Sequence, residues 1–506
     1  MRHRIIASIP CLLALSVAAA AYGAGAPATQ PGPFAYHESQ VLGTSLDLQV
    51  TAGAQADADT AHGAVMAEVE RLRGILSTYD AGSDLGKINA SKDAVKASKE
   101  VIEVLQLYDQ WRTASKGAFS GRLGSLIGVW KNAATAGKMP GKGTVALLVV
   151  AEKNPLWKID EAAGTVQRLT DQVINIDSLG KGFITSRAAA AGMAAPGVRG
   201  LLLNIGGDIT AAGTSSATGT EEWRVGIANP AHPADNAAPL TTVKITGLSI
   251  ATSGSYERGY DIGGTKLSHI LDPRSGYPID SADAPEGKHD PLIASATVIA
   301  KDNAAANALA TSLCVLTPEE GLALIAATPG AEALIVGADG KQIRSAGFAR
   351  FETAVVAQAG PGWPNGAQVS IAISQVTTYR TRPYVAVWIQ NQKGEMVNTL
   401  EEWGNKRYMS SLTNWYKLER SDPKLAAISK ATRPAGKYTL VWDGKDAAGN
   451  VVPHGTYQVC VESAIQGGGH AFSSATIECG EKDATATAEK TAHFEAVGVS
   501  YAAKGG

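Results

Sequence analysis

The sequence predicts an α+β domain followed by an all-β, immunoglobulin-like sandwich domain. In the first part, apolar residues recur at helical spacing in residues 56–77 and 99–115, whereas VLGTSLDLQV alternates as a strand does. In the second part, the segments QVSIAISQV, PYVAVWIQN, KYTLVWDG and GTYQVCVES alternate with a period of two and are bounded by turn sequences. The proline- and glycine-rich segment 357–367 lies between the two patterns and predicts a linker.

Strands and helices mix irregularly in the first part. GLLLNIGGDI predicts a strand, and ASATVIAKDNAAANALATSLCVL predicts a strand that runs into a helix. Thr317 is a good N-cap for the next helix, whereas the segment STYDAGSDLGKIN reads as a polar turn. QVINIDSLGKGF predicts a strand followed by a turn. Because no regular βαβ repeat occurs, we favour an α+β fold over a doubly wound sheet.

Length and charge limit the kinds of partner. The chain has 506 residues, of which 45% are hydrophobic, so it can form more than one packed core. It carries 45 Lys and Arg residues against 47 Asp and Glu, for a net charge of -2. No basic run or aromatic-spaced basic patch occurs, so we expect no nucleic-acid partner.

The N-terminus predicts export. Residues 1–24 combine a charged start, an apolar run interrupted by Pro10 and small residues for cleavage, which is typical of a signal peptide. Residues 25–33 form a short linker, 34–356 the first domain and 368–506 the second. We expect a periplasmic protein without stable membrane insertion after cleavage, with association with the inner membrane left open. In that oxidising compartment, Cys460 and Cys479 are candidates for a disulfide, although no spacing rule proves the pairing.

A polar, glycine-broken stretch at residues 251–280 is the first candidate site. It contains His269 and Asp272 in the sequence SHILDPRSGYP, which places an imidazole and a carboxylate close together. The alternative interpretation is a surface hairpin, YDIGGTKLSHI, with GG as its turn.

Three further motifs have both a functional and a structural interpretation. Lys181, between two glycines in SLGKGF, has the chemistry to bind a phosphate, and Asp208 ends the motif NIGGD, which is also compatible with a simple turn. Asn307 and Thr311 lie at i and i+4 of a predicted helix, so their oxygens share one face. Such a pair suits Mg²⁺ or is simply the polar face of a helix.

The order of the motifs is more specific than any one of them. STYD, GAF, GKGF, NIGGD, W-x-V-G-I, ATSG-x-YER, SHI-x-DPR-x-GYP and ALAT follow one another at sensible distances. Together they resemble the FAD:protein FMN transferase family, also called the ApbE family, over residues 34–351. The C-terminal part resembles an uncharacterised periplasmic β domain.

The resemblance implies a flavin transferase. Members of the family transfer FMN from FAD, with Mg²⁺, to a threonine or serine hydroxyl of a client protein and release AMP. FAD is therefore the expected substrate and Mg²⁺ the expected cofactor. Two alternatives stay open: a catalytically weakened flavin-binding or scaffold protein, and a pyrophosphatase that hydrolyses FAD to FMN and AMP.

The matching motifs carry roles over to particular residues. His269 is the expected base or orienting group for the incoming hydroxyl, and Asp272 is expected to fix its tautomer or the loop. The carbonyl of Ser178, with Asn307 and Thr311, falls at the metal. The positions expected to contact FAD are Leu42, Tyr79, Ala118, Phe119, Ser120, Asn175, Lys181, Asp208 and Ile270.

Several family carboxylates are neutral in this chain. Asn307 stands where the family usually has aspartate, and the same holds for Asn175, Ser120 and Ser186. An amide oxygen coordinates Mg²⁺ without offsetting its charge, so we expect a weaker dependence on Mg²⁺ or a lower activity. No acceptor motif of the D-x-x-[ST]-G-A-T kind occurs, so self-flavinylation is not expected. The pattern specifies no oligomeric state.

Overall fold

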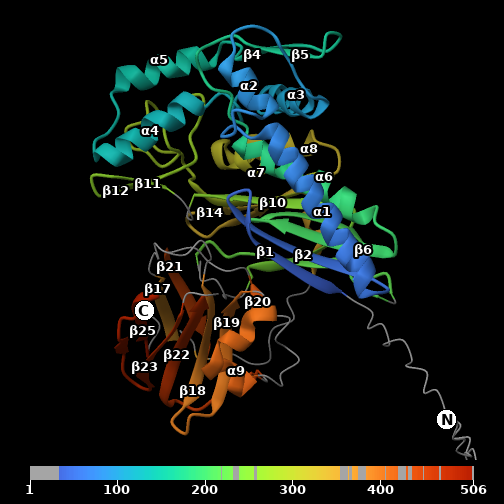
Figure 1. Cartoon of the computed structure of the whole chain (residues 1–506). Helices are drawn as coiled ribbons and strands as arrows, with labels where there is room; N and C mark the ends of the chain where they lie inside the picture. The colour runs from blue at the N-terminus through green and yellow to red at the C-terminus, as the bar shows by residue number, and fades with distance from the viewer. Residues whose placement is uncertain are drawn as a thin grey trace, which may run out of the picture.

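The computed structural model contains the two parts that the sequence predicts (Figure 1). It describes residues 33–217, 219–231, 239–255, 259–353, 363, 367–373, 383–404, 406–419, 429–430, 436–447, 449–465 and 469–503. The predicted signal peptide lies outside these residues, as does most of the predicted linker at 357–367.

An eight-stranded antiparallel sheet forms the centre of the first part. Its strands, in spatial order, are β1 (Phe34–Val41), β2 (Thr44–Ala52), β6 (Val198–Ile205), β7 (Asp208–Gly213), β10 (Leu248–Gly254), β13 (Ile293–Ala300), β14 (Glu332–Gly337) and β15 (Gln342–Arg344). Every neighbouring pair is antiparallel, which excludes a doubly wound fold and confirms the α+β prediction.

Helices cover one face of this sheet (Figure 1). They are α1 (Gln55–Leu76), α6 (Asp177–Met193), α7 (Asn303–Val315) and α8 (Pro318–Ala326). Alternate strand residues such as Leu46, Leu48 and Val50 join the apolar sides of these helices in one large core. The opposite face packs against a small sheet of β8 (Trp223–Ile227), β9 (Thr241–Ile245) and β16 (Glu352–Thr353).

Further elements surround the helical layer. They are α2 (Asp84–Ala90), β3 (Val95–Lys96), α3 (Lys99–Ala114), α4 (Gly124–Ala136), α5 (Lys142–Glu152), β4 (Trp157–Asp160), β5 (Thr165–Arg168), β11 (Gly259–Ile262) and β12 (Thr265–Ser268). The last two strands form the predicted YDIGGTKLSHI hairpin, whose turn glycines have positive φ angles of 60° and 87°. Tyr260, Leu271 and Tyr277 pack with α4 and α5 in a separate apolar cluster.

Two predictions of local structure were wrong. SLGKGF is not a turn after a strand but lies in the first turns of α6. Its glycines serve packing, since a Cβ atom on Gly182 would lie 2.7 Å from the Asn303 carbonyl oxygen on α7. The polar turn predicted at 77–89 also contains helix α2, because the Ser83 hydroxyl accepts a hydrogen bond from the Gly86 amide and caps it.

The C-terminal part is a two-sheet β-sandwich. One sheet has the order β21 (Gly436–Trp442), β17 (Ala367–Ile373), β25 (Phe494–Tyr501), β24 (Ala484–Ala488). The other has the order β20 (Ser429–Lys430), β19 (Met396–Trp403), β18 (Tyr384–Asn391), β22 (Gly455–Ile465), β23 (Gly469–Cys479). The remaining elements are η1 (Phe348–Arg350) in the first part and η2 (Lys406–Ser411) and α9 (Thr413–Glu419) in the sandwich.

Aromatic side chains fill the sandwich core. Trp442 is fully buried and its ring meets that of Trp363 edge-on, with 4.7 Å between the ring centres. Trp363, which the sequence analysis placed in the linker, therefore packs with the second domain. The Tyr457 hydroxyl donates to the Pro453 carbonyl, a contact of the kind found at the corners of immunoglobulin-like sandwiches. The finer immunoglobulin-like topology stays a prediction.

The two candidate disulfide cysteines are buried free thiols. On the β22–β23 hairpin, Cys460 lies opposite Ser474 and Cys479 lies opposite Gly455. This register separates them by five residues along the ladder, or roughly 17 Å, whereas a disulfide requires Cα atoms within about 7 Å. The disulfide that the sequence left open is therefore excluded by strand register.

Candidate active site

A cavity of about 870 Å³ opens where the β1–β2 turn, the end of α1 and the start of α6 meet. Its lining includes three of the predicted flavin-contacting residues, Leu42, Tyr79 and Lys181. Leu42 has a φ of 50°, which is unusual for a residue other than glycine, because it forms the tight β1–β2 turn with Gly43. The volume is within the range of roughly 300–1,000 Å³ that small-molecule sites occupy.

An exposed aromatic ring stands at the edge of this cavity. Tyr79 is 83% exposed, and its hydroxyl donates a 2.8 Å hydrogen bond to the Asp177 carboxylate. That hydrogen bond and the negative charge of Asp177 raise the pKa of Tyr79, so the phenol stays protonated. Asn175 donates its Nδ2 to the same carboxylate at 3.0 Å and accepts from the Asp177 amide. Asn175 therefore stabilises the N-terminus of α6 through these two hydrogen bonds.

A lysine and a buried carboxylate connect the cavity to helix α7. The Lys181 ammonium lies 2.9 Å from Asp208 Oδ2 and donates to the Gly206 carbonyl at 3.0 Å. Asp208 is buried at the start of β7, directly after the Gly206–Gly207 turn of NIGGD. The other carboxylate oxygen of Asp208, Oδ1, accepts a 3.2 Å hydrogen bond from Asn307 Nδ2. Three motifs that are far apart in the sequence thus meet at one carboxylate.

Further contacts along the same side of helix α7 lead from the Asp208 cluster to the SHILDPRSGYP loop. Thr311, one turn beyond Asn307, lies with its hydroxyl 3.1 Å from that of Ser253 on β10. One further turn along, the Val315 carbonyl accepts from Arg274 Nη2 at 3.1 Å. Positions i, i+4 and i+8 of one helix therefore join the Asp208 cluster to the loop that carries His269.

The loop is fixed around the buried carboxylate of Asp272. This carboxylate accepts from the amide, Nε and Nη2 of Arg274, and His289 Nε2 lies 3.3 Å away. Burial alone would raise the pKa of Asp272, but the hydrogen bonds from His289 and Arg274 outweigh it and hold this pKa at about 2. Of the two roles expected for Asp272, these contacts support the fixing of the loop. His269, three positions before Asp272, is exposed.

The other predicted flavin contacts lie deeper in the structure. Ala118, Phe119, Ser120 and Ile270 are all buried, and Phe119 stacks on Tyr108 with 5.4 Å between ring centres. Their role in flavin binding stays a prediction.

The Ser178 hydroxyl contacts Tyr108, the residue on which Phe119 stacks. Ser178 lies in the first turn of α6, and its Oγ is 2.8 Å from the Tyr108 hydroxyl. A place for the Ser178 carbonyl beside Asn307 and Thr311 stays a prediction.

The donor chemistry of the Asp208 cluster fits a hard cation. Asp208, Asn307 and Thr311 offer one carboxylate, one amide and one hydroxyl oxygen, the ligand types that Mg²⁺ accepts. Over the described ranges, no group of three or more His, Cys, Asp and Glu side chains has the arrangement of a metal site. The set therefore suits Mg²⁺ with waters or substrate oxygens as further ligands, rather than a transition metal.

Comparison with known proteins identifies the family. The model of the ApbE family matches residues 42–335, which is more than half of the chain. The chain belongs to the ApbE family. A second model, described as a predicted periplasmic protein (DUF2271), matches residues 366–496.

Curated relatives and solved structures agree with this assignment. An FAD:protein FMN transferase of Klebsiella pneumoniae is 26% identical over 271 residues, covering 53% of this chain and 79% of the relative. One of Treponema pallidum is 27% identical over 290 residues, covering 54% and 76%. The apo flavinyl transferase ApbE of Pseudomonas stutzeri has a TM-score of 0.51 at 24% identity, covering 64% of this chain and 99% of its own. The ApbE protein of Thermotoga maritima has a TM-score of 0.54 at 23% identity, covering 63% and 99%. The structures establish a shared fold.

Three residues of this ApbE-family site were missed or underrated in the sequence. Asp177 and His289 lie in polar, turn-like contexts that resemble many surface segments, and Ser253 is one of several hydroxyls in its strand. Their roles depend on partners 98, 17 and 58 positions away. The Asn-x-Asp spacing at 175–177 was the one local signal, since Asn and Asp before a helix are typical capping residues.

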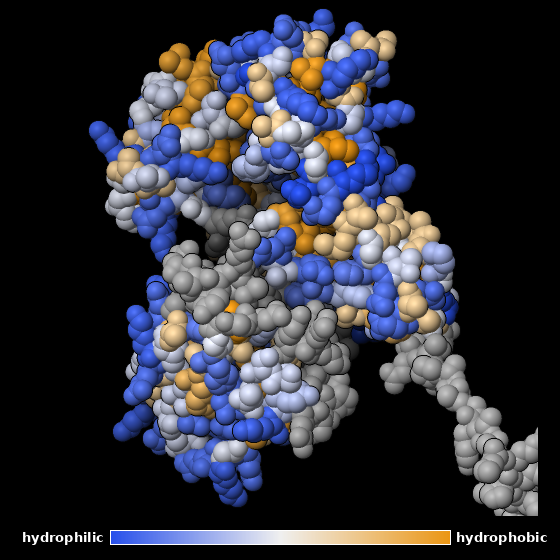
Figure 2. All heavy atoms as spheres, viewed as in Figure 1, coloured by the Kyte–Doolittle hydropathy of each residue, from blue (hydrophilic) through white to orange (hydrophobic). Residues whose placement is uncertain are grey.

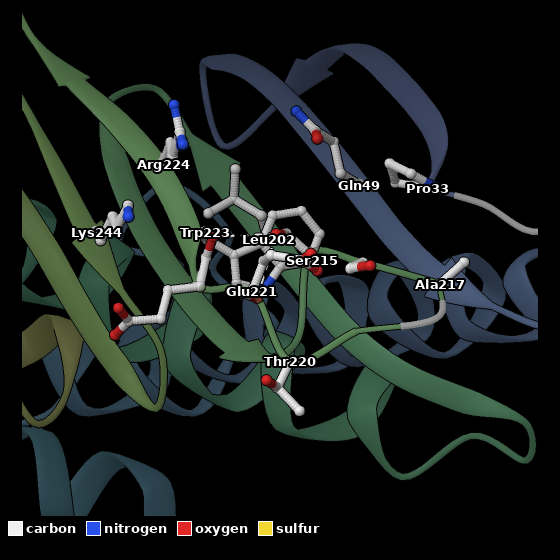
Figure 3. A pocket seen from close by; sticks show the side chains of 12 residues that line it. Pro33, Gln49, Leu202, Ser215, Ala217, Thr220, Glu221, Trp223, Arg224 and Lys244 are labelled. Atoms are coloured by element: carbon white, nitrogen blue, oxygen red, sulfur yellow. Dashed lines mark hydrogen bonds between the residues drawn. The ribbon is translucent and has the colours of Figure 1, made fainter. Parts of the chain in front are cut away.

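A second cavity, of about 790 Å³, lies beside strand β8 (Figure 3). Gln49 of β2, Leu202 of β6 and Trp223 of β8 line it, together with Arg224 and Lys244 on neighbouring strands. None of the predicted ApbE-family site residues lines this cavity. Of the two cavities, only the one beside Lys181 is lined by predicted site residues.

Proposed function

We propose that this chain transfers FMN from FAD to a serine or threonine hydroxyl of a client protein and releases AMP. The observation that carries the proposal is the meeting of Lys181, Asp208 and Asn307 beside the cavity that Leu42 and Tyr79 line. The names of the curated relatives support the same reaction.

The cavity is the proposed flavin site. Tyr79 offers an exposed ring face on which an aromatic ring system stacks. The Lys181 ammonium, which lines the cavity, offers positive charge to a diphosphate. Asp177 and Asn175 hold the Tyr79 hydroxyl and the first turn of α6 in place.

The SHILDPRSGYP loop supplies the acceptor side of the reaction. The client hydroxyl oxygen attacks the phosphorus on the FMN side of the FAD diphosphate, so a new P–O bond forms. The bond to the bridging oxygen breaks, and that oxygen leaves with AMP. His269 accepts the proton of the attacking hydroxyl, and Asp272, with Arg274 and His289, holds the loop that positions His269.

Magnesium is part of the proposal. Asp208, Asn307 and Thr311 would hold the ion, with the Ser178 carbonyl as a further candidate ligand. When bound there, Mg²⁺ would offset negative charge on the phosphates. Asp208 is the one carboxylate among these donors and already pairs with Lys181. We therefore expect weaker metal binding than at a site with a second carboxylate.

The location and division of the chain are proposed from the same comparisons. The description of the second matched family supports a periplasmic protein, with residues 1–24 removed on export. We place the transferase domain at 34–356 and the sandwich near 368–506, with Trp363 packed on the latter. No helix among the described residues has the length and apolar character needed to cross a bilayer. Association with the inner membrane is part of the same proposal.

A client assay tests the function. The purified protein is incubated with FAD and a client carrying a D-x-x-[ST]-G-A-T acceptor, with and without Mg²⁺, and both the fluorescent client band and AMP are measured. The proposal requires equal amounts of flavinylated client and AMP, with less of both when Mg²⁺ is removed. His269→Ala is the matched variant and should abolish both products while FAD still binds. Absence of both products with the unaltered protein would sink the proposal.

Asn175 and Asn307 favour one alternative, a flavin-binding protein that has lost most of its turnover. In that case FAD binds in the cavity, but neither a flavinylated client nor AMP forms. AMP without a flavinylated client would instead indicate hydrolysis of FAD by water.

A further inference from the structure

Helix α5 is apolar on the side that faces away from the domain. Leu147 is 73% exposed and Val150 is 60% exposed, and the two lie one turn apart on the same side. A surface helix normally carries polar residues on this side. Figure 2 shows hydrophobic atoms gathered at the upper left of the molecule, where Figure 1 places α5.

The inner side of α5 is already occupied. Val145 and Val149 lie against Gly276, so closely that a Cβ atom there would be 2.8 and 2.7 Å from their methyl groups. Glu152 is also buried on the inner side, with Oε2 3.8 Å from Arg112 Nη2. These contacts fix the rotation of the helix about its axis. Leu147 and Val150 therefore cannot turn inward without exposing Val145 and drawing Glu152 away from Arg112.

The exposed charge around this face is positive. The α4–α5 hairpin, residues 124–153, has a single acidic residue, the buried Glu152. Its exposed charged residues are Lys131, Lys138, Lys142 and Lys153. Lys142 and Lys153 flank the apolar face, about three helical turns apart on one side. The neighbouring Asp283 lies 3.8 Å from Lys142. Because this ion pair is exposed to solvent, it offsets little of the positive charge of the four lysines.

We propose that the outer face of the α4–α5 hairpin binds peripherally to the surface of an anionic lipid bilayer. Leu147 and Val150 enter the boundary between headgroups and acyl chains, and the four lysines approach anionic headgroups. With 11 residues, α5 is about 16 Å long, too short to span a hydrocarbon layer of about 30 Å. The helix therefore lies in the interface.

Charge selects this partner over the others. A second copy of the chain would bring the same lysines against each other, which opposes a symmetric contact. Binding to a soluble protein through an apolar surface would not require four exposed lysines in a hairpin that has no exposed acidic residue. Under the proposed function, binding here places the loop of Asp272 and Gly276 one helix away from the bilayer, within reach of a membrane-anchored client.

Vesicle sedimentation of the exported protein tests this surface. The vesicles contain either equal parts of phosphatidylglycerol and phosphatidylcholine or phosphatidylcholine alone, at 50 mM and 500 mM NaCl. We expect binding to the anionic vesicles at low salt, with a loss of about tenfold or more at high salt. We also expect a loss of about tenfold or more in the double variant Leu147→Glu, Val150→Glu.

The matched control is Val451→Glu, which places the same charge at a 48% exposed valine of the sandwich domain and should leave binding unchanged. Circular dichroism of each variant confirms folding, which both exposed substitutions should preserve. The proposal is overturned by equal binding to neutral vesicles, by no binding at low salt, or by full binding of the double variant. It is also overturned if the double variant only abolishes self-association in light scattering. None of these outcomes depends on FAD or on turnover.

Discussion

The site contains two buried carboxylates, Asp272 and Asp208, that are held in different ways. Asp272 accepts three hydrogen bonds from Arg274 and lies beside His289, all within one loop and the segment that follows it. Asp208 faces one ammonium, from Lys181, and one amide, from Asn307, on two different helices. The first arrangement builds a rigid loop. The second leaves a carboxylate whose partners can be exchanged for a ligand or a cation.

The two carboxylates also differ in the charge of the groups around them. The Asp272 carboxylate has the Arg274 guanidinium and hydrogen bonds from Arg274 and His289, so the anion is stabilised whether or not substrate is present. The Asp208–Lys181 pair has no net charge, so under the proposed function a divalent cation would gain little there before phosphate oxygens add negative charge. The same residue type is therefore structural in one half of the site and available for ligand binding in the other.

Removing the Asp272 carboxylate should have the largest effect on stability. Asp272→Ala leaves Arg274 and His289 without their common acceptor, and we expect a loss of about 2–3 kcal/mol in the free energy of unfolding, because the Arg274 side chain still reaches water. Urea denaturation measures it. Asp208→Ala is the matched variant at the other carboxylate and should cost less, since Asp208 accepts from Lys181 and Asn307 only, whereas Asp272 accepts three hydrogen bonds from Arg274 and lies beside His289. Equal losses would contradict the distinction between the two carboxylates.

Acid should reveal the same difference without mutation. The pKa of Asp272 is about 2, below its ordinary value of 3.8, so its contribution to stability is present above pH 4 and is lost as the pH falls toward 2. The shift corresponds to about 2 kcal/mol. Urea denaturation between pH 5 and pH 2.5 checks this, with Asp272→Asn as the control. The variant should show a flatter pH dependence in this window, and an unchanged dependence would assign the loss to other carboxyl groups.

Restoring a carboxylate should convert the second cluster into a stronger metal site. Asn307→Asp places a second negative charge beside Asp208 and should tighten Mn²⁺ binding to the flavin-free protein by about tenfold, or about 1.4 kcal/mol. Titration followed by the electron paramagnetic resonance of free Mn²⁺ measures this binding.

The two adjacent carboxylates should also couple metal binding to pH. Like charges raise the pKa of one member of the pair, so Mn²⁺ affinity in Asn307→Asp should rise with pH as that proton is released. Asn307→Ala is the control and should bind no more tightly than the unaltered protein. If Asn307→Asp gave no gain in Mn²⁺ affinity, Asn307 would lie outside the metal site.

The smallest effect should come from the Tyr79 hydroxyl. If the exposed ring provides the binding surface, Tyr79→Phe changes FAD affinity by less than about threefold, whereas Tyr79→Ala weakens it about tenfold. Quenching of flavin fluorescence measures both. Equal losses in Tyr79→Phe and Tyr79→Ala would show that the hydrogen bond to Asp177, which both variants remove, is more important than the ring.

Local features of the fold followed from the sequence. Apolar spacing predicted α1, α3 and α7, and the Thr317 cap of α8 forms the full capping box with Glu320. The paired glycines of the β11–β12 hairpin and of NIGGD adopt the positive φ angles that tight turns need. These features depend on residues within a few positions of each other, which is the range over which sequence patterns are informative.

What only the tertiary structure decided was the partner of each polar group. The glycines around Lys181 looked like a phosphate loop, but they lie within α6, and Gly182 permits its close approach to α7. Cys460 and Cys479 looked like a disulfide pair until strand register separated them. The apolar outer face of α5 and the burial of Glu152 depend on how that helix packs against Gly276 and Arg112. The sequence therefore determined the elements and the family, whereas long-range packing chose which charges meet, because those partners lie tens of residues apart.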